Sequence, residues 1–325
     1  MMPARRVSKI MTEKSKSLGA ESAYRLEAQD CVQGMVGIPE ASVDIVVTSP
    51  PYNLGIKYKN YNDSRTRNEY LDWSRDWARE VKRTLKDKGS FFLNLGSAPS
   101  NPLIPHELVV TLKDVGFVLQ NTFHWIKSIT VQTKEGQQIS AGHFKPLHSK
   151  RYVNDCHEYV FHLTKHGDTP LNRLGVGVPY SDKSNINRWA HTKGQDLRCR
   201  GNNWFIPYKT IVNRSKQRPH PATFPVELAE FCIKIHGSKP DLVVMDPFLG
   251  IGHSALAAKR CGIKEFIGFD IDPSYVKLAR AALARGSTEP TIDLLGDAVH
   301  SSRQRREPVN QGELKIDSAA NFRRK

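Results

Sequence analysis

Residues 242–270 place a strand, a glycine turn, a helix and a second strand in close succession. The apolar run 242–245 leads into Asp246-Pro247-Phe248-Leu249-Gly250-Ile251-Gly252, and a helical stretch follows over residues 254–260, with Gly262 as its C′ residue. The next strand, residues 266–269, ends at Asp270, twenty positions after Gly250. A glycine turn between a strand and a helix lets a ligand approach the backbone closely. This order predicts a nucleoside-binding βαβ unit, followed by a helix with Asp272 as N-cap and Pro273 at N1.

The turn leaves two ligand classes open. Gly250 to Ala255 matches the dinucleotide fingerprint G-x-G-x-x-A, and Asp270 is placed to meet a ribose hydroxyl, as in a nicotinamide oxidoreductase. Asp246, however, ends the strand directly before the turn, where a carboxylate would repel a pyrophosphate. A ligand with an ammonium group and no phosphate suits this position better. S-adenosylmethionine has that chemistry.

A second motif, Thr48-Ser49-Pro50-Pro51-Tyr52, follows the buried-strand run 45–47. Two consecutive prolines fix the backbone and supply no N–H, so the carbonyls of Ser49 and Pro50 are held as hydrogen-bond acceptors. Tyr52 offers a flat ring beside them. Acceptors next to a ring suit a planar group with an exocyclic amine, such as a nucleobase flipped out of its stack. A proline-rich strand end with a packing tyrosine is the alternative.

Together the two motifs resemble those of the β class of amino-methylating DNA methyltransferases, over nearly the whole chain. The resemblance makes the Ser49–Tyr52 segment the catalytic motif, in the serine form typical of N4-cytosine enzymes, with catalytic residues Ser49, Pro50, Pro51 and Tyr52. It places Asp30 near the adenine of the cofactor, although Gln29 stands where the family has a glycine. It also implies a set of cofactor-binding residues: Asp30, His220, Pro221, Phe224, Asp246, Pro247, Phe248, Gly250, Gly252 and Asp270.

The fold implied is α/β: a Rossmann-like S-adenosylmethionine-dependent methyltransferase fold, circularly permuted so that the catalytic half precedes the cofactor half. We expect a mostly parallel sheet with helices on both faces and an inserted DNA target recognition region. The expected division is a basic tail (1–20), the catalytic half (21–126), the recognition region (127–218), the cofactor half (219–299) and a second basic tail (300–325). Both tails are expected to be disordered.

The formal net charge of +15 is concentrated in particular segments. Residues 127–218 hold sixteen Lys or Arg against six Asp or Glu, whereas the catalytic region outside this segment and the tails is slightly acidic. Such a concentration indicates a surface that contacts phosphates. Polar stretches and frequent glycines and prolines predict loops over residues 136–188. Candidate DNA-binding residues are those whose side chains commonly read base edges: Arg188, Arg198, Arg200, Asn202 and Asn203.

Several further expectations concern the surroundings of these motifs. Residues 70–85 carry an amphipathic helical pattern with Trp73 and Trp77 expected in the core; residues 89–95 are the next strand, and residues 53–68 a mobile loop beside the active site. Five dispersed cysteines suggest neither a disulfide framework nor a zinc site, so no metal is expected. With no apolar run near eighteen residues and no signal peptide, we expect a cytoplasmic protein without a membrane span. The family resemblance implies a bacterial, archaeal or phage origin.

The sequence thus predicts a site-specific DNA methyltransferase that transfers a methyl group from S-adenosylmethionine to the N4 amine of a flipped-out cytosine. N6-adenine methylation is the main alternative, because family members acting on adenine usually have Asp at the position of Ser49. A protein-glutamine methyltransferase would be expected to carry Asn-Pro-Pro-Tyr and to need no basic region, and a nicotinamide oxidoreductase is disfavoured by Asp246. The expected partners are double-stranded DNA and a cognate restriction endonuclease, with the enzyme acting as a monomer or homodimer.

Overall fold

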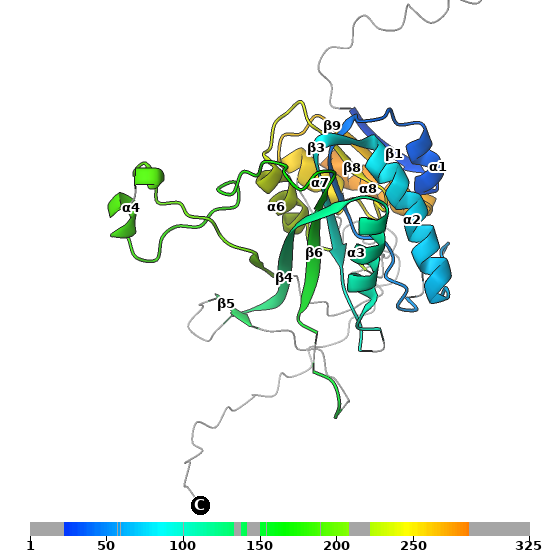
Figure 1. The fold of residues 1–325 in the computed structure, drawn as a ribbon, viewed down its shortest axis with the longest axis horizontal. Coiled ribbons are helices and arrows are strands. Elements are labelled where there is room, and N and C mark those ends of the chain that lie inside the picture. The colour runs from blue at the N-terminus through cyan, green and yellow to red at the C-terminus, as the bar shows by residue number, and fades with distance from the viewer. Residues whose placement is uncertain are drawn as a thin grey trace, which may run out of the picture.

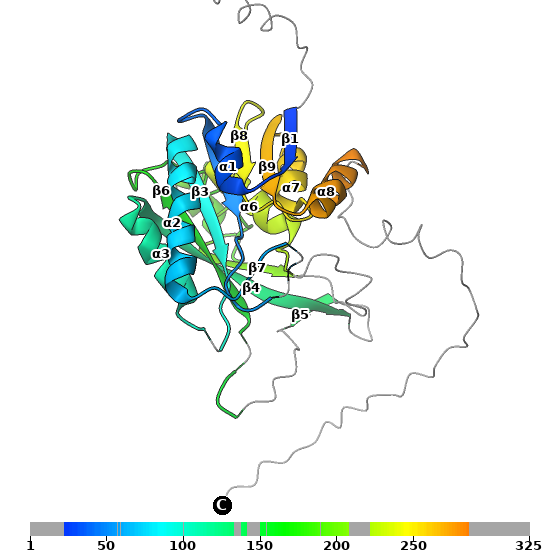
Figure 2. The ribbon, with the colours of Figure 1, turned by 90° about the vertical axis from the view of Figure 1, so that its right-hand side faces the viewer.

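The strands form one mixed sheet in the computed structural model, which describes residues 23–56, 58, 60–99, 101–132, 138–141, 150–153, 155–188, 190–207 and 222–285. The strand order is β1-β9-β8-β2-β3-β6-β4-β5, with β7 paired to β4. Figure 2 shows β1 and β9 near one end of the sheet and β4 and β5 near the other. The strand bounds are β1 Ala23–Ala28, β2 Val43–Thr48, β3 Leu85–Leu95, β4 Val118–Gln132, β5 Gln138–Ala141, β6 His157–Thr164, β7 Asn203–Pro207, β8 Val243–Asp246 and β9 Glu265–Asp270.

Five neighbouring strands, β1, β9, β8, β2 and β3, are parallel. Strand β6 runs antiparallel to both β3 and β4, and β7 is parallel to β4. The expected mostly parallel α/β sheet is therefore confirmed. Strands β2 and β8, which precede the two motifs, are far apart in the chain but pair directly. Because they run parallel, their carboxyl ends lie at the same edge of the sheet.

Helices cover both faces of the sheet, each over its own apolar core (Figure 1). Helices α1, α2 and α3 contact one another in series on one face, and α6, α7 and α8 do so on the other. Trp77 is fully buried in the core under α1, α2 and α3, and Trp204 is fully buried in the core under α6, α7 and α8. The helix bounds are α1 Cys31–Val36, α2 Arg67–Thr84, α3 Ile104–Asp114, α4 Asn185–Arg188, α6 Val226–His236, α7 His253–Arg260 and α8 Pro273–Arg285, with a 3-10 helix at Ala190–Thr192.

The expected helix over residues 70–85 begins three residues early. Thr66 caps it and Glu69 bonds back to the Thr66 backbone, so a capping box inside the expected loop starts the helix at Arg67. Strand β3 then begins at Leu85 with no intervening loop. The loop prediction for residues 136–188 is wrong over His157–Thr164, because β6 is an interior strand whose side chains Val160, Phe161 and Leu163 are buried.

The recognition region expected at residues 127–218 therefore supplies part of the sheet. What leaves the body is a shorter arm, residues 178–198 with residue 189 undescribed, which carries α4 away from the sheet (Figure 1). Val178 and Arg198 form an antiparallel bridge at its base. Both expected basic tails, 1–20 and 300–325, lie outside the described residues. No helix in the described part of the chain is long and apolar enough to cross a membrane.

Gly252 and Gly262 flank helix α7 with left-handed backbones, at φ values of 85° and 75°. A Cβ at Gly252 would lie 2.6 Å from the Ala279 Cβ on α8, whereas a Cβ at Gly262 would meet nothing within 4 Å. We expect Gly252→Ala to lower the free energy of unfolding by about 2 to 4 kcal/mol, since backbone strain adds to overpacking. Gly262→Ala should cost only the strain, about 1 to 2 kcal/mol. Urea denaturation checks the difference, and equal losses would contradict it.

Candidate active site

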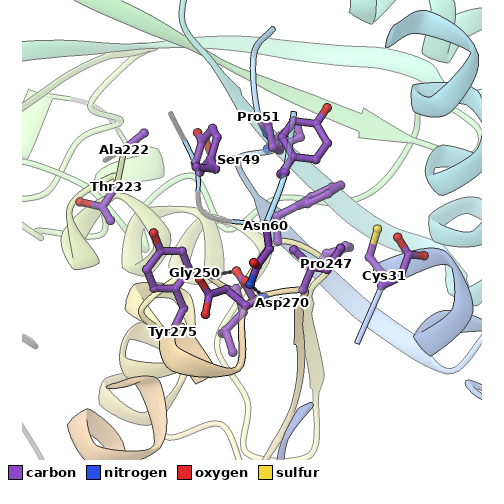
Figure 3. Close-up of a pocket in the computed structure, with 18 of the residues that line it drawn as sticks. Cys31, Ser49, Pro51, Asn60, Ala222, Thr223, Pro247, Gly250, Asp270 and Tyr275 are labelled. Carbon is purple, nitrogen blue, oxygen red and sulfur yellow. Dashed lines mark hydrogen bonds between the residues drawn. The ribbon is translucent and has the colours of Figure 1, made fainter. Parts of the chain in front are cut away.

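A pocket opens at the carboxyl edge of the parallel strands, where β1, β2, β8 and β9 end. Figure 3 shows Ser49 and Pro51 toward one end of it and Gly250 and Asp270 toward the other, with Asn60 between. Segments far apart in the sequence thus line one pocket. Of the residues expected from the sequence to form the site, the following line the pocket: Asp30, Ser49, Pro50, Pro51, Tyr52, Phe224, Pro247, Phe248, Gly250 and Asp270. His220 and Pro221 lie outside the described residues.

Asp270 ends β9, and its side chain holds the glycine turn that follows the neighbouring strand β8. Its Oδ2 accepts a hydrogen bond from the Gly250 backbone at 2.8 Å, and its Oδ1 accepts one from the Asp272 backbone at 2.8 Å. Burial raises the pKa of this carboxyl, while the two backbone donors oppose the rise. The carboxylate therefore faces the pocket in a defined orientation, with lone pairs still available for a ligand hydroxyl.

Asp30 occupies the N-cap of α1. Its side chain accepts hydrogen bonds from the Val32 and Gln33 backbones at 2.9 and 3.2 Å. The preceding Gln29 backbone donates to the Asp270 carbonyl at 2.9 Å, which joins the ends of β1 and β9. The two acidic residues expected at the cofactor are thus brought together at adjacent strand ends, and both line the pocket.

The carboxylate of Asp246 is directed into the protein. The residue is 1% exposed and is not among the residues that line the pocket. Oδ1 accepts from Thr48 Oγ1 at 2.5 Å and from the Phe248 backbone at 2.9 Å, and Oδ2 accepts from Ser254 Oγ at 2.5 Å. The expectation that this carboxylate meets a ligand ammonium directly is not supported by this geometry. Instead Asp246 ties the ends of β2 and β8 to the start of α7.

Gly252 also lies outside the lining of the pocket. Its missing side chain lets α7 and α8 approach closely, and its expected contact with the cofactor stays a prediction.

The catalytic motif Ser49–Tyr52 is anchored at both ends. Thr48 before it is bonded to Asp246, and the Tyr70 hydroxyl on α2 donates to the Pro51 carbonyl at 2.8 Å. Ser49 Oγ lies 2.6 Å from the Tyr52 hydroxyl. Burial, followed by the charge of Glu158, raises the pKa of Tyr52 well above its usual range, so its phenol stays protonated.

Three residues that the sequence analysis missed lie behind Tyr52, outside the pocket lining: Asn94 near the end of β3, Glu158 on β6 and Lys127 on β4. Asn94 Nδ2 lies 2.9 Å from the Tyr52 hydroxyl and 2.6 Å from Glu158 Oε2. The Tyr52 hydroxyl donates to Glu158 Oε2 at 3.1 Å, and Lys127 Nζ pairs with Glu158 Oε1 at 2.7 Å. No local sequence pattern marks these residues, because strand pairing alone brings them together.

An aromatic wall closes the other side of the pocket. Trp73, expected in the core, packs against the core of the α1–α3 face and also lines the pocket beside Phe248, with ring centroids 5.6 Å apart. The Arg65 guanidinium lies 5.0 Å from the centre of the Trp73 ring. The loop that carries Arg65 is organised around the Asp63 carboxylate, which accepts backbone hydrogen bonds from Asn53, Leu54 and Ile56.

The candidate DNA-binding residues lie away from the pocket lining and differ in environment. Arg188 and Arg198 are exposed on the arm, at α4 and at the base. Arg200 is held against the body: its Nε donates to the Val176 carbonyl at 2.8 Å and its guanidinium lies over Phe231, which argues against base reading. Asn202 donates to the Thr122 carbonyl at 3.1 Å, and Asn203 is exposed at the start of β7. No cluster of potential metal ligands occurs within the described ranges.

Comparison with known proteins identifies the family. A model of the N6/N4 methyltransferases, described as DNA methylase, matches residues 43–281, which include both motifs. Type II methyltransferase M.HpaI of Haemophilus parainfluenzae is 26% identical over 259 residues, which cover 80% of this chain and 74% of that protein. The chain therefore belongs to the N6/N4 DNA methylase family. It is a DNA methyltransferase of the amino-methylating kind.

Solved structures share the fold. The PvuII DNA methyltransferase, described as cytosine-N4-specific, has a TM-score of 0.59 at 22% identity, and the match covers 86% of this chain and 94% of that chain. A protein of Thermus thermophilus described as a DNA modification methylase, solved in complex with S-adenosyl-L-methionine, has a TM-score of 0.54 at 24% identity, covering 82% of this chain and all of that one (100%). The S-adenosylmethionine-dependent methyltransferase fold expected from the sequence is thereby confirmed.

The buried Asp246 gives a pH-dependent contribution to stability. Burial raises the pKa of this carboxyl from 3.8 to about 6. Since the folded protein binds the proton more tightly, the contribution is fully present below about pH 4 and is lost as the pH rises through about 6, a change of roughly 3 kcal/mol. Relative to an Asp246→Asn variant, the wild type should therefore lose about that much free energy of unfolding between acidic and neutral pH. Urea denaturation of both proteins checks this, and parallel pH dependences would contradict it.

Proposed function

We propose that this protein is a site-specific DNA methyltransferase that methylates the N4 amine of cytosine in a base flipped out of duplex DNA, with S-adenosylmethionine as cofactor. The observation that carries the proposal is the serine at the first position of the catalytic motif. Ser49 lines the same pocket as Asp270 and the glycine turn. Adenine-specific relatives usually have Asp there, so a product of N6-methyladenine is the alternative outcome of the test below.

The pocket fits S-adenosylmethionine at its sheet-edge end. Asp270 offers an oriented carboxylate to ribose hydroxyls, Asp30 lies beside it, and Phe248 and Trp73 provide apolar faces for an adenine ring. The cofactor, when bound, supplies an electrophilic methyl group. A fold neighbour solved in complex with this molecule gives further support. The turn from Pro247 to Gly250 would allow the close backbone approach that such a ligand needs.

The opposite end of the pocket suits a planar amine. A cytosine amine is a weak nucleophile, because its lone pair is delocalised into the ring. We infer that Ser49 Oγ and the Pro50 carbonyl accept its two N–H groups, which favours a pyramidal nitrogen directed at the methyl group. Pro51 keeps the segment rigid, and the Tyr52 ring is proposed to stack against the base. Most of the rate enhancement then comes from positioning.

Replacing Ser49 by Ala should slow methyl transfer by about two orders of magnitude or more, since it removes an acceptor needed in the transition state. Single-turnover assays on DNA digested to nucleosides, followed by mass spectrometry, measure the rate and identify the methylated base. Cofactor affinity by calorimetry should stay within a few fold, whereas Asp270→Ala should weaken it by roughly 1 to 3 kcal/mol. Equal rates for Ser49→Ala and wild type would refute the catalytic assignment.

The DNA-binding proposal depends on the position and charge of the arm. Residues 178–198 hold four Lys or Arg against two Asp, and α4 on this arm stands out from the body (Figure 1). An exposed arm of positive charge beside the sheet can reach phosphates or bases of a duplex whose target base enters the pocket. We assign Arg188 and Arg198 to this contact, with Asn203 at the start of β7. We propose double-stranded DNA as the partner, together with a restriction endonuclease, because the similar proteins include Type II methyltransferases.

Neutralising Arg198 with Gln should lower DNA affinity and reduce the slope of log K against log salt by about one, if this guanidinium contacts a phosphate. If it reads guanine instead, the loss of about 1 to 3 kcal/mol should be confined to the cognate sequence. Arg79→Gln on α2 is the matched control, since Arg79 is an exposed arginine, paired with Asp76, on a helix that packs over one sheet face. Fluorescence anisotropy over a salt series makes the measurement. Unchanged affinity and slope for Arg198→Gln would contradict the assignment.

A further inference from the structure

The hydrogen bonds around Tyr52 can be assigned a donor and an acceptor each. A phenol carries one proton, and the Tyr52 hydroxyl donates it to Glu158 Oε2 at 3.1 Å. Ser49 Oγ lies 2.6 Å from the same hydroxyl, and either oxygen could donate in that pair. We assign the serine as the donor, because a carboxylate is a stronger acceptor of the phenol proton than a hydroxyl is. Asn94 Nδ2 lies 3.5 Å from Ser49 Oγ, and the serine oxygen keeps a lone pair that can accept from a group in the pocket. The chain Ser49–Tyr52–Glu158 therefore runs from the pocket to a carboxylate.

Glu158 is held at the end of this chain as a charged acceptor. Lys127 Nζ lies 2.7 Å from its Oε1, and the two side chains are only 21% and 14% exposed. Asn94 Nδ2 lies within hydrogen-bonding distance of both Glu158 Oε2 and the Tyr52 hydroxyl. Gly96 leaves room for the arrangement, since a Cβ there would lie 3.0 Å from the Tyr52 ring and 3.1 Å from the Glu158 carboxyl.

Methylation of an exocyclic amine releases a proton that needs an acceptor. Neither serine nor a phenol can keep that proton, because their protonated forms are strong acids. Burial and the charge of Glu158 keep the pKa of Tyr52 high, so it is a carrier and not a base. Within the described part of the chain, Glu158 is the carboxylate hydrogen-bonded to this motif.

We propose that Glu158 takes up the proton released from the substrate amine, through Tyr52 and Ser49, and that Asn94 and Lys127 hold it in position for this task. The proposal rests on the proposed amine methylation. Glu158 does not itself touch the base. It acts through Tyr52, as the final acceptor of the proton.

The step balances as follows. The nitrogen lone pair forms the N–CH3 bond while the S–CH3 bond breaks and its electron pair goes to sulfur. The N–H bond of the methylated amine then breaks, its electron pair stays on nitrogen, and the proton goes to Ser49 Oγ. Ser49 passes its own proton to the Tyr52 oxygen, and Tyr52 passes its proton to Glu158 Oε2. Glu158 ends neutral and later loses the proton to solvent.

Single-turnover methylation by Glu158→Gln, measured between about pH 5 and pH 9, tests the relay. We expect the rate at neutral pH to fall about 10²-fold, and the decline of the wild-type rate toward acidic pH to disappear in the variant. Glu158→Asp should restore part of the rate together with the acidic decline. Tyr52→Phe should cost a similar factor, and the double variant should lose little more, since both interrupt one chain.

Glu107→Gln is the matched control, because Glu107 is a similarly shielded glutamate, 17% exposed and paired with Arg67 on α2. Cofactor affinity by calorimetry and DNA affinity by anisotropy should stay within a few fold of wild type in Glu158→Gln. A Glu158→Gln rate within about threefold of wild type, or an unchanged pH profile, would overturn the relay. The base methylated by the wild type is identified separately in the digested DNA, so N6-methyladenine would overturn the cytosine assignment and leave the relay standing.

Discussion

The buried contact of Asp246 with Thr48 and Ser254 is the constraint on which the site depends. Thr48 is the last residue of β2 and immediately precedes the catalytic motif, whereas Asp246 ends β8 and immediately precedes the glycine turn. The two residues are 198 positions apart in the chain. Because their strands are parallel neighbours, one carboxylate can fix the relative position of both motifs. Ser254 extends the same contact to the start of α7.

The site thus contains a buried carboxylate, Asp246, and a half-buried one, Glu158, in different electrostatic environments. Asp246 is surrounded by neutral donors, so desolvation dominates and its pKa rises to about 6. Glu158 has the ammonium group of Lys127 against one oxygen and neutral donors against the other. A cation offsets the cost of burying charge, which lets a carboxylate serve as an acceptor close to the substrate. Asp246 holds the two strand ends together, and we assign Glu158 as the acceptor of the proton.

The region expected to recognise DNA is built into the sheet more deeply than an insertion would be. Strand β6 pairs with β3 and β4, and Trp204 on β7 stacks on Phe123 at 4.3 Å between ring centroids. Strand β7 follows the arm in the chain and pairs with β4. Strand β4 also pairs with β6, which carries Glu158. Arg200 packed over Phe231 secures the base of the arm to α6. The strand that follows the arm and the strand that carries Glu158 thus share one partner, β4.

The sequence by itself determined the local elements and the two motifs. The pattern from residue 242 to Asp270 predicted a strand, turn, helix and strand that the structure contains. The prolines and serine of residues 49–51 marked a segment that lines the pocket. These features are local, because propensity, capping and turn chemistry act over a few residues. Tertiary structure alone decided which side chains meet. It directed Asp246 inward, brought Trp73 to the pocket wall and placed Asn94, Lys127 and Glu158 around Tyr52. Such contacts depend on which strands pair and in which register, and a register is set by the packing of the whole sheet.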